Sequence, residues 1–421
     1  MQATTNPVVN FAKIPQELDH PNWELVLDYT DTQVYTRHGA SNSKIVGFKT
    51  ITYHAIAART LYHFLKDVNG AMETMNELFV LGEILKTWEI PSDEEGVLVR
   101  TSFEMPFPFA NREFVHGQHG AQLDKDTFVV AYTPIDIPET PVQQGYVRCP
   151  MFVSGQRIQK MPNGLVRVEH LMTYELGGKV SSYIQDQWLK KAHTKAYVGE
   201  WRNLHAYHFP CAVTEIDYAT LSSILKDAVE QSDQWAIAKT INEGTIRVGR
   251  LPYCPKNVYR TDTEIKAPLA QVVDVIADQS LDYLPKWNKE FMQGEILEVL
   301  EENDQKSAWL IRVHYKTPFF LKNREYIYYF SREWLTETEV LITYHSVKHE
   351  LEVPKGFVRA LLHPSVHYCQ ALPNGNTLLK HLLATDLKGN LSNHQDALLK
   401  GGLVQAHCRD IQNQHALFEQ L

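Results

Sequence analysis

Two arginine side chains in this sequence could bind an anion inside the protein. Arg112 and Arg324 each stand between an asparagine and a glutamate, directly after a short apolar segment. An unpaired guanidinium is costly to bury, so each arginine needs a carboxylate or a phosphate as its partner. The neighbouring Glu113 and Glu325 point to the other side of the strand, because side chains alternate along it. The pattern favours a structural ion pair or a loop anchor, and direct contact with a ligand is the alternative.

Two tyrosines could place a hydroxyl group in a binding site. Tyr132 and Tyr344 stand at matched positions of two similar halves of the sequence. A buried tyrosine needs a hydrogen-bond partner, which the polar end of a ligand could supply. The pattern favours a core tyrosine with a backbone partner over this ligand contact. If the protein catalysed a reaction, His116 and Tyr328 would be the nearest candidates for a general acid or base.

Other catalytic and metal-binding patterns have little support. His363 and His367 have the spacing of two metal ligands on a helix, but the segment is predicted to be a strand. Residues four apart on a strand are separated by about 13 Å, so we expect no metal site. The sequence contains no G-x-S-x-G, P-loop or G-x-G-x-x-G motif. Nucleophilic and nucleotide-dependent chemistry are therefore not expected, nor is any cofactor.

The composition is that of a globular protein with two sizeable cores. The chain has 421 residues, 44% of them hydrophobic and 22% charged, a length that suits two domains. A net charge of −9 disfavours nucleic acid or an anionic membrane as an electrostatically bound partner. The five cysteines never form a C-x-x-C pair, which argues against a zinc site or a disulfide framework. We recognise no secretory signal or membrane span, and expect a cytoplasmic protein with reduced thiols.

The sequence contains two copies of one pattern, which indicates a duplication with about 210 residues per copy. Matched blocks follow in the same order in both halves, with a spacing of 212 residues that becomes 211 further along. The blocks with their second copies are Gly82–Leu85 with Gly294–Leu297, Asn111–Glu113 with Asn323–Glu325, Gly145–Arg148 with Gly356–Arg359, and Pro162–Gly164 with Pro373–Gly375.

Each copy is predicted to contain strands, two short helices, more strands and a long C-terminal helix. The expected helices of the first copy are 57–65, 73–81 and 182–207, and its later strands are 97–105, 113–118, 127–132, 146–159 and 165–176. The second copy is expected to begin with an amphipathic helix within 216–235 and to end with a helix from about residue 393. That last helix contains Gly401-Gly402, for which we consider close packing or a hinge.

The repeated blocks resemble a known family. Met105–Val115 is similar to the P-F-P-x-x-N-R-D-[FY]-V signature of START domains, closest to the phosphatidylcholine-transfer type, and Thr317–Ile327 is similar to it again. Trp287 lies in a segment that resembles the family's W-D-x-x-[FV] helix. The resemblance covers nearly the whole chain, twice. It implies an α+β architecture of two consecutive helix-grip domains, 1–207 and 208–421, each a curved antiparallel sheet wrapped around a long C-terminal helix.

The resemblance also implies a function, binding and intermembrane transfer of one apolar lipid in the cavity of one or both domains, without catalysis. Phosphatidylcholine-binding members have an arginine three residues before the helix tryptophan, where this sequence has Leu284. We therefore favour a sterol, isoprenoid or fatty-acyl ligand over a phospholipid. One alternative is a two-domain polyketide aromatase/cyclase. Another is that one copy is a degenerate regulatory scaffold, because Met75 replaces Trp287 in the first copy.

The resemblance places an apolar loop at the rim of each cavity. Phe107 and Phe109 in the first copy, and Phe319 and Phe320 in the second, belong to this loop. Apolar side chains on a short connection are unusual unless something covers them. Packing against the C-terminal helix and transient contact with a membrane surface are both possible. The lipid-binding residues that we expect are Phe107, Phe109, Arg112, Tyr132, Trp287, Phe319, Phe320, Arg324 and Tyr344, and the sequence gives no indication of the oligomeric state.

Overall fold

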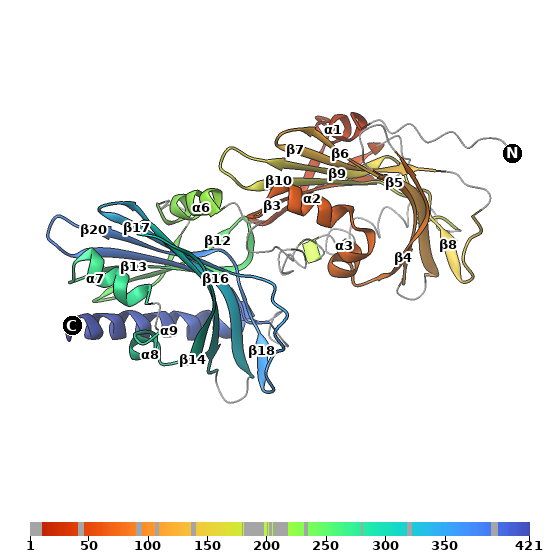
Figure 1. The fold of residues 1–421 in the computed structure, drawn as a ribbon. Coiled ribbons are helices and arrows are strands. Elements are labelled where there is room, and N and C mark those ends of the chain that lie inside the picture. Colours follow the sequence, from red (N-terminus) through yellow and green to blue (C-terminus); the bar gives the residue numbers. More distant parts are fainter. Residues whose placement is uncertain are drawn as a thin grey trace. The chain divides into compact units, whose positions relative to one another are not determined.

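The chain divides into two compact units, Met1–Tyr207 and His208–Leu421. Figure 1 shows both units in a computed structural model. The structure describes residues 11–40, 46–89, 95–105, 109–135, 140–178, 180, 198–199, 201, 204, 218–230, 235–278, 281–317, 322–388 and 395–421.

Unit 1 is built on a curved antiparallel sheet of ten described strands in the order β1-β2-β3-β10-β9-β7-β6-β5-β4, with β8 added in parallel to β6. Alternation of buried and less buried residues along β2 and β9 reflects one face turned to the interior. The strands are β1 Glu24–Asp28, β2 Thr32–His38, β3 Val46–His54, β4 Phe79–Glu89, β5 Glu95–Phe103, β6 Asn111–Asp124, β7 Thr127–Pro134, β8 Tyr146–Arg148, β9 Ser154–Lys160 and β10 Val166–Met172.

The helices of unit 1 cover both faces of this sheet. α1 (Lys13–Leu18) buries Ile14 and Leu18 against β9 and β10. On the other face, α2 (Ala58–Lys66) packs on β7 and β9, and α3 (Val68–Met75) lies against β4. The expected closing helix 182–207 lies outside the described residues, except for Val198, Gly199, Trp201 and Leu204, of which Trp201 is completely buried.

Unit 2 repeats this architecture with a sheet in the order β11-β12-β13-β21-β20-β17-β16-β15-β14. β18 pairs in parallel with β16, as β8 does with β6, and β19 pairs with β21. The strands are β11 Ala236–Ile241, β12 Gly244–Leu251, β13 Cys254–Ile265, β14 Phe291–Glu302, β15 Lys306–Tyr315, β16 Asn323–Thr336, β17 Glu339–Ser346, β18 Phe357–Arg359, β19 Leu361–Leu362, β20 Ser365–Ala371 and β21 Thr377–Asp386.

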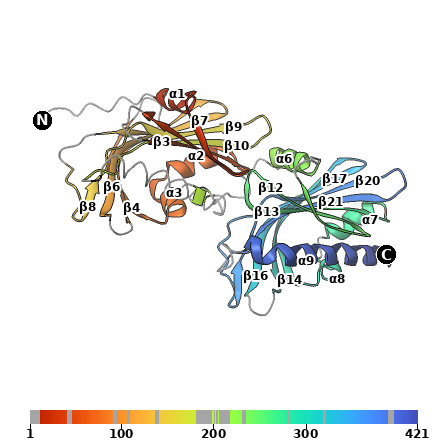
Figure 2. The same cartoon turned by 180° about the vertical axis from the view of Figure 1, so that it is seen from behind.

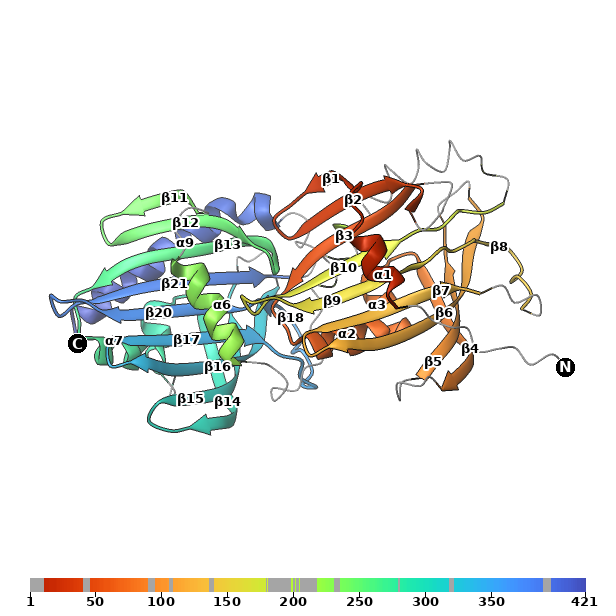
Figure 3. The same cartoon turned by 90° about the horizontal axis from the view of Figure 1, so that it is seen from above.

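Helices also cover both faces of the second sheet. α9 (Gln395–Phe418) runs along the concave face against β11, β12 and β13, as Figure 2 shows from behind. α8 (Leu284–Trp287) packs between α9 and β14, and α7 (Leu269–Ile276) lies on β20. α6 (Tyr218–Glu230) crosses β17, β20 and β21 on the opposite face (Figure 3). A curved sheet closed by a long helix is the helix-grip fold, so the expected fold class is confirmed.

Two expected elements are wrong. The predicted helix 73–81 ends at Met75, because the Asn76 Oδ1 accepts a hydrogen bond from the Leu78 amide in a local turn, and strand β4 follows. The predicted strand 146–159 is two strands, β8 and β9, separated by a segment that contains Pro150. Proline has no N–H to donate to a ladder, which explains the break.

Candidate lipid-binding cavities

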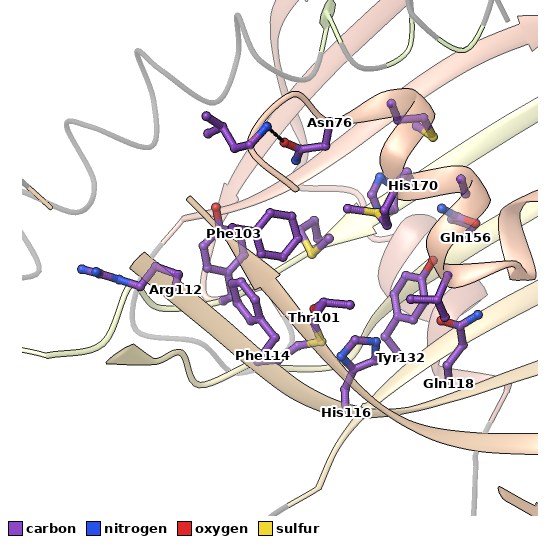
Figure 4. Close-up of a pocket in the computed structure, with 18 of the residues that line it drawn as sticks. Asn76, Thr101, Phe103, Arg112, Phe114, His116, Gln118, Tyr132, Gln156 and His170 are labelled. Carbon is purple, nitrogen blue, oxygen red and sulfur yellow. Dashed lines mark hydrogen bonds between the residues drawn. The ribbon is translucent and has the colours of Figure 1, made fainter. Parts of the chain in front are cut away.

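Each unit contains a cavity on the concave side of its sheet. The cavity of unit 1 has a volume of about 310 Å³ and is bordered by α3 and by strands β5, β6, β7, β9 and β10 (Figure 4). The cavity of unit 2 has a volume of about 230 Å³ and is bordered by α8, α9 and the matching strands. Cavities lined mainly by apolar and aromatic groups with a few polar ones are typical of small-molecule sites.

Strand β6 illustrates how the sheet supplies these linings. Arg112, Phe114, His116 and Gln118 all face the cavity, because every second residue of a strand points to the same side. In unit 2 the alternate residues Tyr326, Tyr328 and Phe330 of β16 line the cavity in the same way. Alternate residues of each strand therefore form one wall of the cavity.

Methionine is the commonest apolar residue in the lining of the first cavity. Met72, Met75, Met105, Met151 and Met172 border it, five of the eight methionines in the chain. The described lining of the second cavity contains no methionine and is formed largely by leucine, isoleucine, tyrosine and histidine. A thioether side chain is flexible and polarizable, so it fills irregular spaces and adapts to different shapes. The two cavities therefore differ in chemical character.

Tyr132 and His116 belong to the polar part of the first cavity. Their rings meet edge to face with centroids 5.4 Å apart, beside Gln118 (Figure 4). Burial raises the pKa of Tyr132, and burial together with His119 lowers the pKa of His116 to about 4. Both groups are therefore neutral near pH 7, and they can exchange hydrogen bonds with a ligand without carrying charge.

The second cavity holds a larger polar cluster. The Tyr344 hydroxyl is hydrogen-bonded to His381 Nε2, and the His381 ring stacks on His367 with centroids 3.9 Å apart. His407 of α9 meets His381 edge to face at 5.9 Å. Burial lowers the pKa of all three histidines, to about 3 for His367 and about 4 for His407. We refer to Tyr344, His367, His381 and His407 as the imidazole cluster.

Arg112 and Arg324 anchor the loops at one end of each sheet. The Arg112 Nε–H donates a 2.6 Å hydrogen bond to the Leu176 carbonyl, and its Nη1 donates to the Ala110 carbonyl. Arg324 makes the equivalent bonds to the carbonyls of Leu387, at 2.6 Å, and Lys322. Their hydrogen-bond partners are therefore main-chain carbonyls rather than the carboxylate or phosphate that the sequence suggested. Arg112 also borders the first cavity.

The neighbouring glutamates bind three further arginines on the other face of the sheet. Glu113 and Glu325 have no exposed side-chain surface. Arg148 on β8 donates to Glu113, while Arg359 on β18 and Arg312 on β15 donate to Glu325. Burial alone would raise the pKa of Glu325, but these bonds and one with His314 outweigh it, so its pKa is lowered. The Asn-Arg-Glu block and the Gly-x-Val-Arg block were identified as repeats in the sequence, but contact between their glutamate and arginine was not predicted.

The other expected site residues are placed as follows. Trp287 is buried and lines the second cavity, and Met75 occupies the corresponding wall of the first. Phe109 is half-buried and does not border the described cavity, whereas Phe107, Phe319 and Phe320 lie outside the described residues. Among the described residues, no cluster of histidine, cysteine or acidic side chains is arranged to hold a metal ion. In the same part of the chain, no helix is both long and apolar enough to span a membrane.

Sequence comparison assigns both units to one family. The family model of the START domain matches residues 16–208 and matches again at residues 216–405. The chain belongs to the START-domain family. Each of its two START domains thus carries a cavity in a family of lipid-binding domains. Tyr344 was among the expected site residues, but the three histidines of the imidazole cluster were missed by sequence reasoning, although His367 and His381 stand at matched positions to Gln156 and His170 of the first domain.

Several solved structures are similar to part of the chain. Human StAR-related lipid transfer protein 5 is 20% identical and covers 48% of this chain and 96% of its own, with a TM-score of 0.42. The STAR-related lipid transfer protein of Xanthomonas axonopodis is 18% identical over 44% of this chain and 99% of its own, with a TM-score of 0.36. The Zhui aromatase/cyclase of a Streptomyces species is 14% identical over 39% of this chain and 93% of its own, with a TM-score of 0.27. No curated protein sequence matches the chain.

Proposed function

We propose that this protein is a tandem lipid carrier of the cytoplasm, in which each START domain binds one lipid and transfers it between membranes without chemical change. The observation that carries the proposal is the pair of cavities, one in each unit, with mainly apolar linings. Moving a lipid from a bilayer to such a cavity exchanges one apolar surrounding for another. Burial of a methylene group away from water is worth about 0.8 kcal/mol in either surrounding, so the two contributions nearly cancel. Release of the lipid is therefore as feasible as its uptake.

The ligand is proposed to be a sterol, isoprenoid or fatty-acyl lipid rather than phosphatidylcholine. Leu284 stands where phosphatidylcholine-binding members have an arginine, and it lines the second cavity. The described lining of that cavity contains no arginine or lysine that could neutralise a phosphate. Burying an unpaired phosphate would be costly, so a neutral lipid fits this lining better.

The proposal can be tested with matched cavity-blocking variants of the full-length chain. Met172 on β10 and Leu383 on β21 stand at equivalent positions, and each lines the cavity of its own unit. Replacement of either by tryptophan should fill part of that cavity. After exposure to a total lipid extract, native mass spectrometry should find two lipids per wild-type chain, one in M172W or L383W, and none in the double variant.

Each alternative predicts another stoichiometry. One lipid per wild-type chain, lost in only one single variant, would identify the other domain as a degenerate scaffold. No bound lipid after trials with sterols, fatty acids and phospholipids would overturn the carrier proposal. Transfer itself should be measured with fluorescent lipid moving from donor to acceptor liposomes. Wild-type protein should accelerate this transfer, and the double variant should not.

A further inference from the structure

The second cavity contains polar ring atoms that no described side chain or backbone group satisfies. Both ring nitrogens of His367, Nε2 of His407 and Oδ1 of Asp410 have no hydrogen-bond partner among the described residues. His367 and His407 are only 7% and 5% exposed, and all three residues line the cavity. A buried polar atom without a partner costs about 1–3 kcal/mol, so this end of the cavity favours a ligand that supplies the missing bonds.

The geometry of the cluster fixes where these atoms lie. His367 and His381 are direct register partners on β20 and β21, which explains why their rings stack. Tyr344 on β17 holds His381 through its hydroxyl, and α9 brings His407 against the edge of the same ring. The rings are thus positioned by three strands and a helix. The unpartnered nitrogens belong to a built site rather than to freely rotating surface side chains.

The charge of the site selects among polar ligand groups. The histidines are neutral near pH 7, because burial and their mutual proximity disfavour the imidazolium form. Asp410 and Asp278 are the acidic side chains of the described lining, which contains no arginine or lysine, and burial raises the pKa of Asp410 to about 7. A carboxylate or phosphate would therefore enter without a cationic partner and next to an acidic side chain. A neutral group does not meet this penalty.

A hydroxyl group matches the hydrogen-bonding capacity of neutral imidazole. Each neutral ring offers one N–H donor and one nitrogen acceptor, and a hydroxyl both donates and accepts. An ether or ketone oxygen only accepts, and a hydrocarbon does neither. We propose that His367 and His407 form a hydroxyl-binding site in unit 2, which makes this domain selective for aliphatic lipid alcohols. This inference rests on the proposed carrier function.

The first domain does not repeat this site. Gln156 stands at the position of His367, and Ala196 stands in the sequence at the position of His407. Its cavity instead has the adaptable methionine lining. The proposal therefore includes a difference between the halves, in which unit 2 selects the ligand by its polar group and unit 1 accepts a wider range of shapes.

The test uses the full-length chain labelled with ¹⁵N in its histidine rings, so that the signals of His367 and His407 report on unit 2 alone. Four probes share one apolar tail: decanol, decyl methyl ether, undecane and decanoate. Decanol should shift both ring signals and bind about tenfold more tightly than undecane, the effect expected from one or two net hydrogen bonds. The ether should fall between them, and decanoate should bind more weakly than decanol.

Two variants and one control complete the experiment. H367F and H407F keep a ring but remove its nitrogens, so each should reduce the preference for decanol over undecane to about threefold or less. Retained binding of undecane shows that the cavity is intact in these variants. H345F replaces a buried histidine on β17 that does not line the described cavity, and it should preserve the preference.

The outcomes are distinguishable. Equal affinities for decanol and undecane in the wild-type chain, or an unchanged preference in both variants, would overturn the hydroxyl site and leave the carrier function standing. Tighter binding of decanoate than of decanol would overturn the selectivity for neutral alcohols. If none of the four probes bound and the extract experiment also found no bound lipid, the carrier proposal would be overturned together with the site.

Discussion

Glu113 and Arg148 are register partners on the parallel strands β6 and β8, and the Arg148 Nε–H donates a 2.7 Å hydrogen bond to Glu113 Oε1. Glu325 and Arg359 repeat this ion pair on β16 and β18, at 2.6 Å. The preceding arginines point the other way and hold the segments that follow β10 and β21. The Asn-Arg-Glu motif thus secures one end of each sheet from both faces.

Loss of the Glu325 carboxylate should destabilise the second unit strongly. E325Q leaves the largely buried Arg359 without its anionic partner and leaves Arg312 with only the exposed Glu295, which should cost about 3 kcal/mol. The matched control is E295Q, because Glu295 binds the same Arg312 but is 57% exposed. An exposed ion pair is worth about 0–1 kcal/mol. Calorimetric unfolding of the full chain measures both, and equal effects would contradict a structural role for Glu325.

The arginine anchor should require the fork geometry of a guanidinium. Arg324 donates to carbonyls of two separate segments, through Nε to Leu387 and through Nη1 to Lys322. A lysine carries a single point of charge and cannot reproduce these directions. R324K should therefore accelerate hydrogen exchange of the amides near residues 386–388. Unchanged protection there would show that the charge alone holds the segment.

Acidification should destabilise the fold through its buried histidines. Burial lowers the folded-state pKa of His345 and His407 from 6.5 to about 4. A lowered folded-state pKa means that the unfolded chain binds the proton more tightly, so stability is highest above pH 6.5 and is lost as the pH falls towards 4. Denaturant midpoints measured through this window should fall. H345F should make that fall shallower, and an unchanged slope would argue against the buried neutral form.

Asp410 should show the opposite pH dependence. Burial and the neighbouring Glu290 raise its folded-state pKa from 3.8 to about 7, although Arg409 partly offsets them. A raised folded-state pKa contributes stability below pH 3.8 that is lost as the pH rises to about 7. D410N should therefore stabilise the protein at slightly alkaline pH and have little effect near pH 4. Equal effects at both pH values would show that the carboxyl does not titrate abnormally.

Gly402 should tolerate alanine. It lies in the exposed part of α9, and an added Cβ would meet no atom within 4 Å, so close packing does not explain this glycine. G402A should stabilise the helix by about 1 kcal/mol. The remaining hypothesis is a hinge in α9, which predicts slower lipid exchange in the liposome assay for the same variant. A stabilised protein with wild-type exchange kinetics would exclude the hinge at this residue.

The local pattern of the sequence was sufficient for much of the fold. The repeat predicted two equivalent sheets, and the matched Pro-Asn-Gly blocks adopt the same turn in both units, where Gly164 and Gly375 have φ near +83°. The helix from about residue 393 is confirmed by α9. The predicted helix 73–81 failed because a side-chain turn at Asn76 outweighed the apolar pattern around it.

The polar chemistry of the second cavity could not be read from local patterns. His367 and His381 become neighbours only through the register of β20 with β21, and His407 reaches them from a helix after the last strand. Similarly, the contact between Glu113 and Arg148 depends on the parallel pairing of β8, a strand of three residues. Which of these side chains become neighbours therefore depends on the pairing of strands that are distant in the sequence, and local residue types do not reveal it.

The methionine lining of the first cavity also makes that domain sensitive to oxidants. Oxidation of a thioether to a sulfoxide places a polar, chiral oxygen on a side chain that had been apolar. Five such side chains border one cavity, whereas the described lining of the other has none. Under oxidising conditions the two halves of the chain would differ in a second way, since the lining of one cavity would gain polar sulfoxide groups and the described lining of the other would not. Methionine sulfoxide reductases would then restore the capacity of the first domain alone.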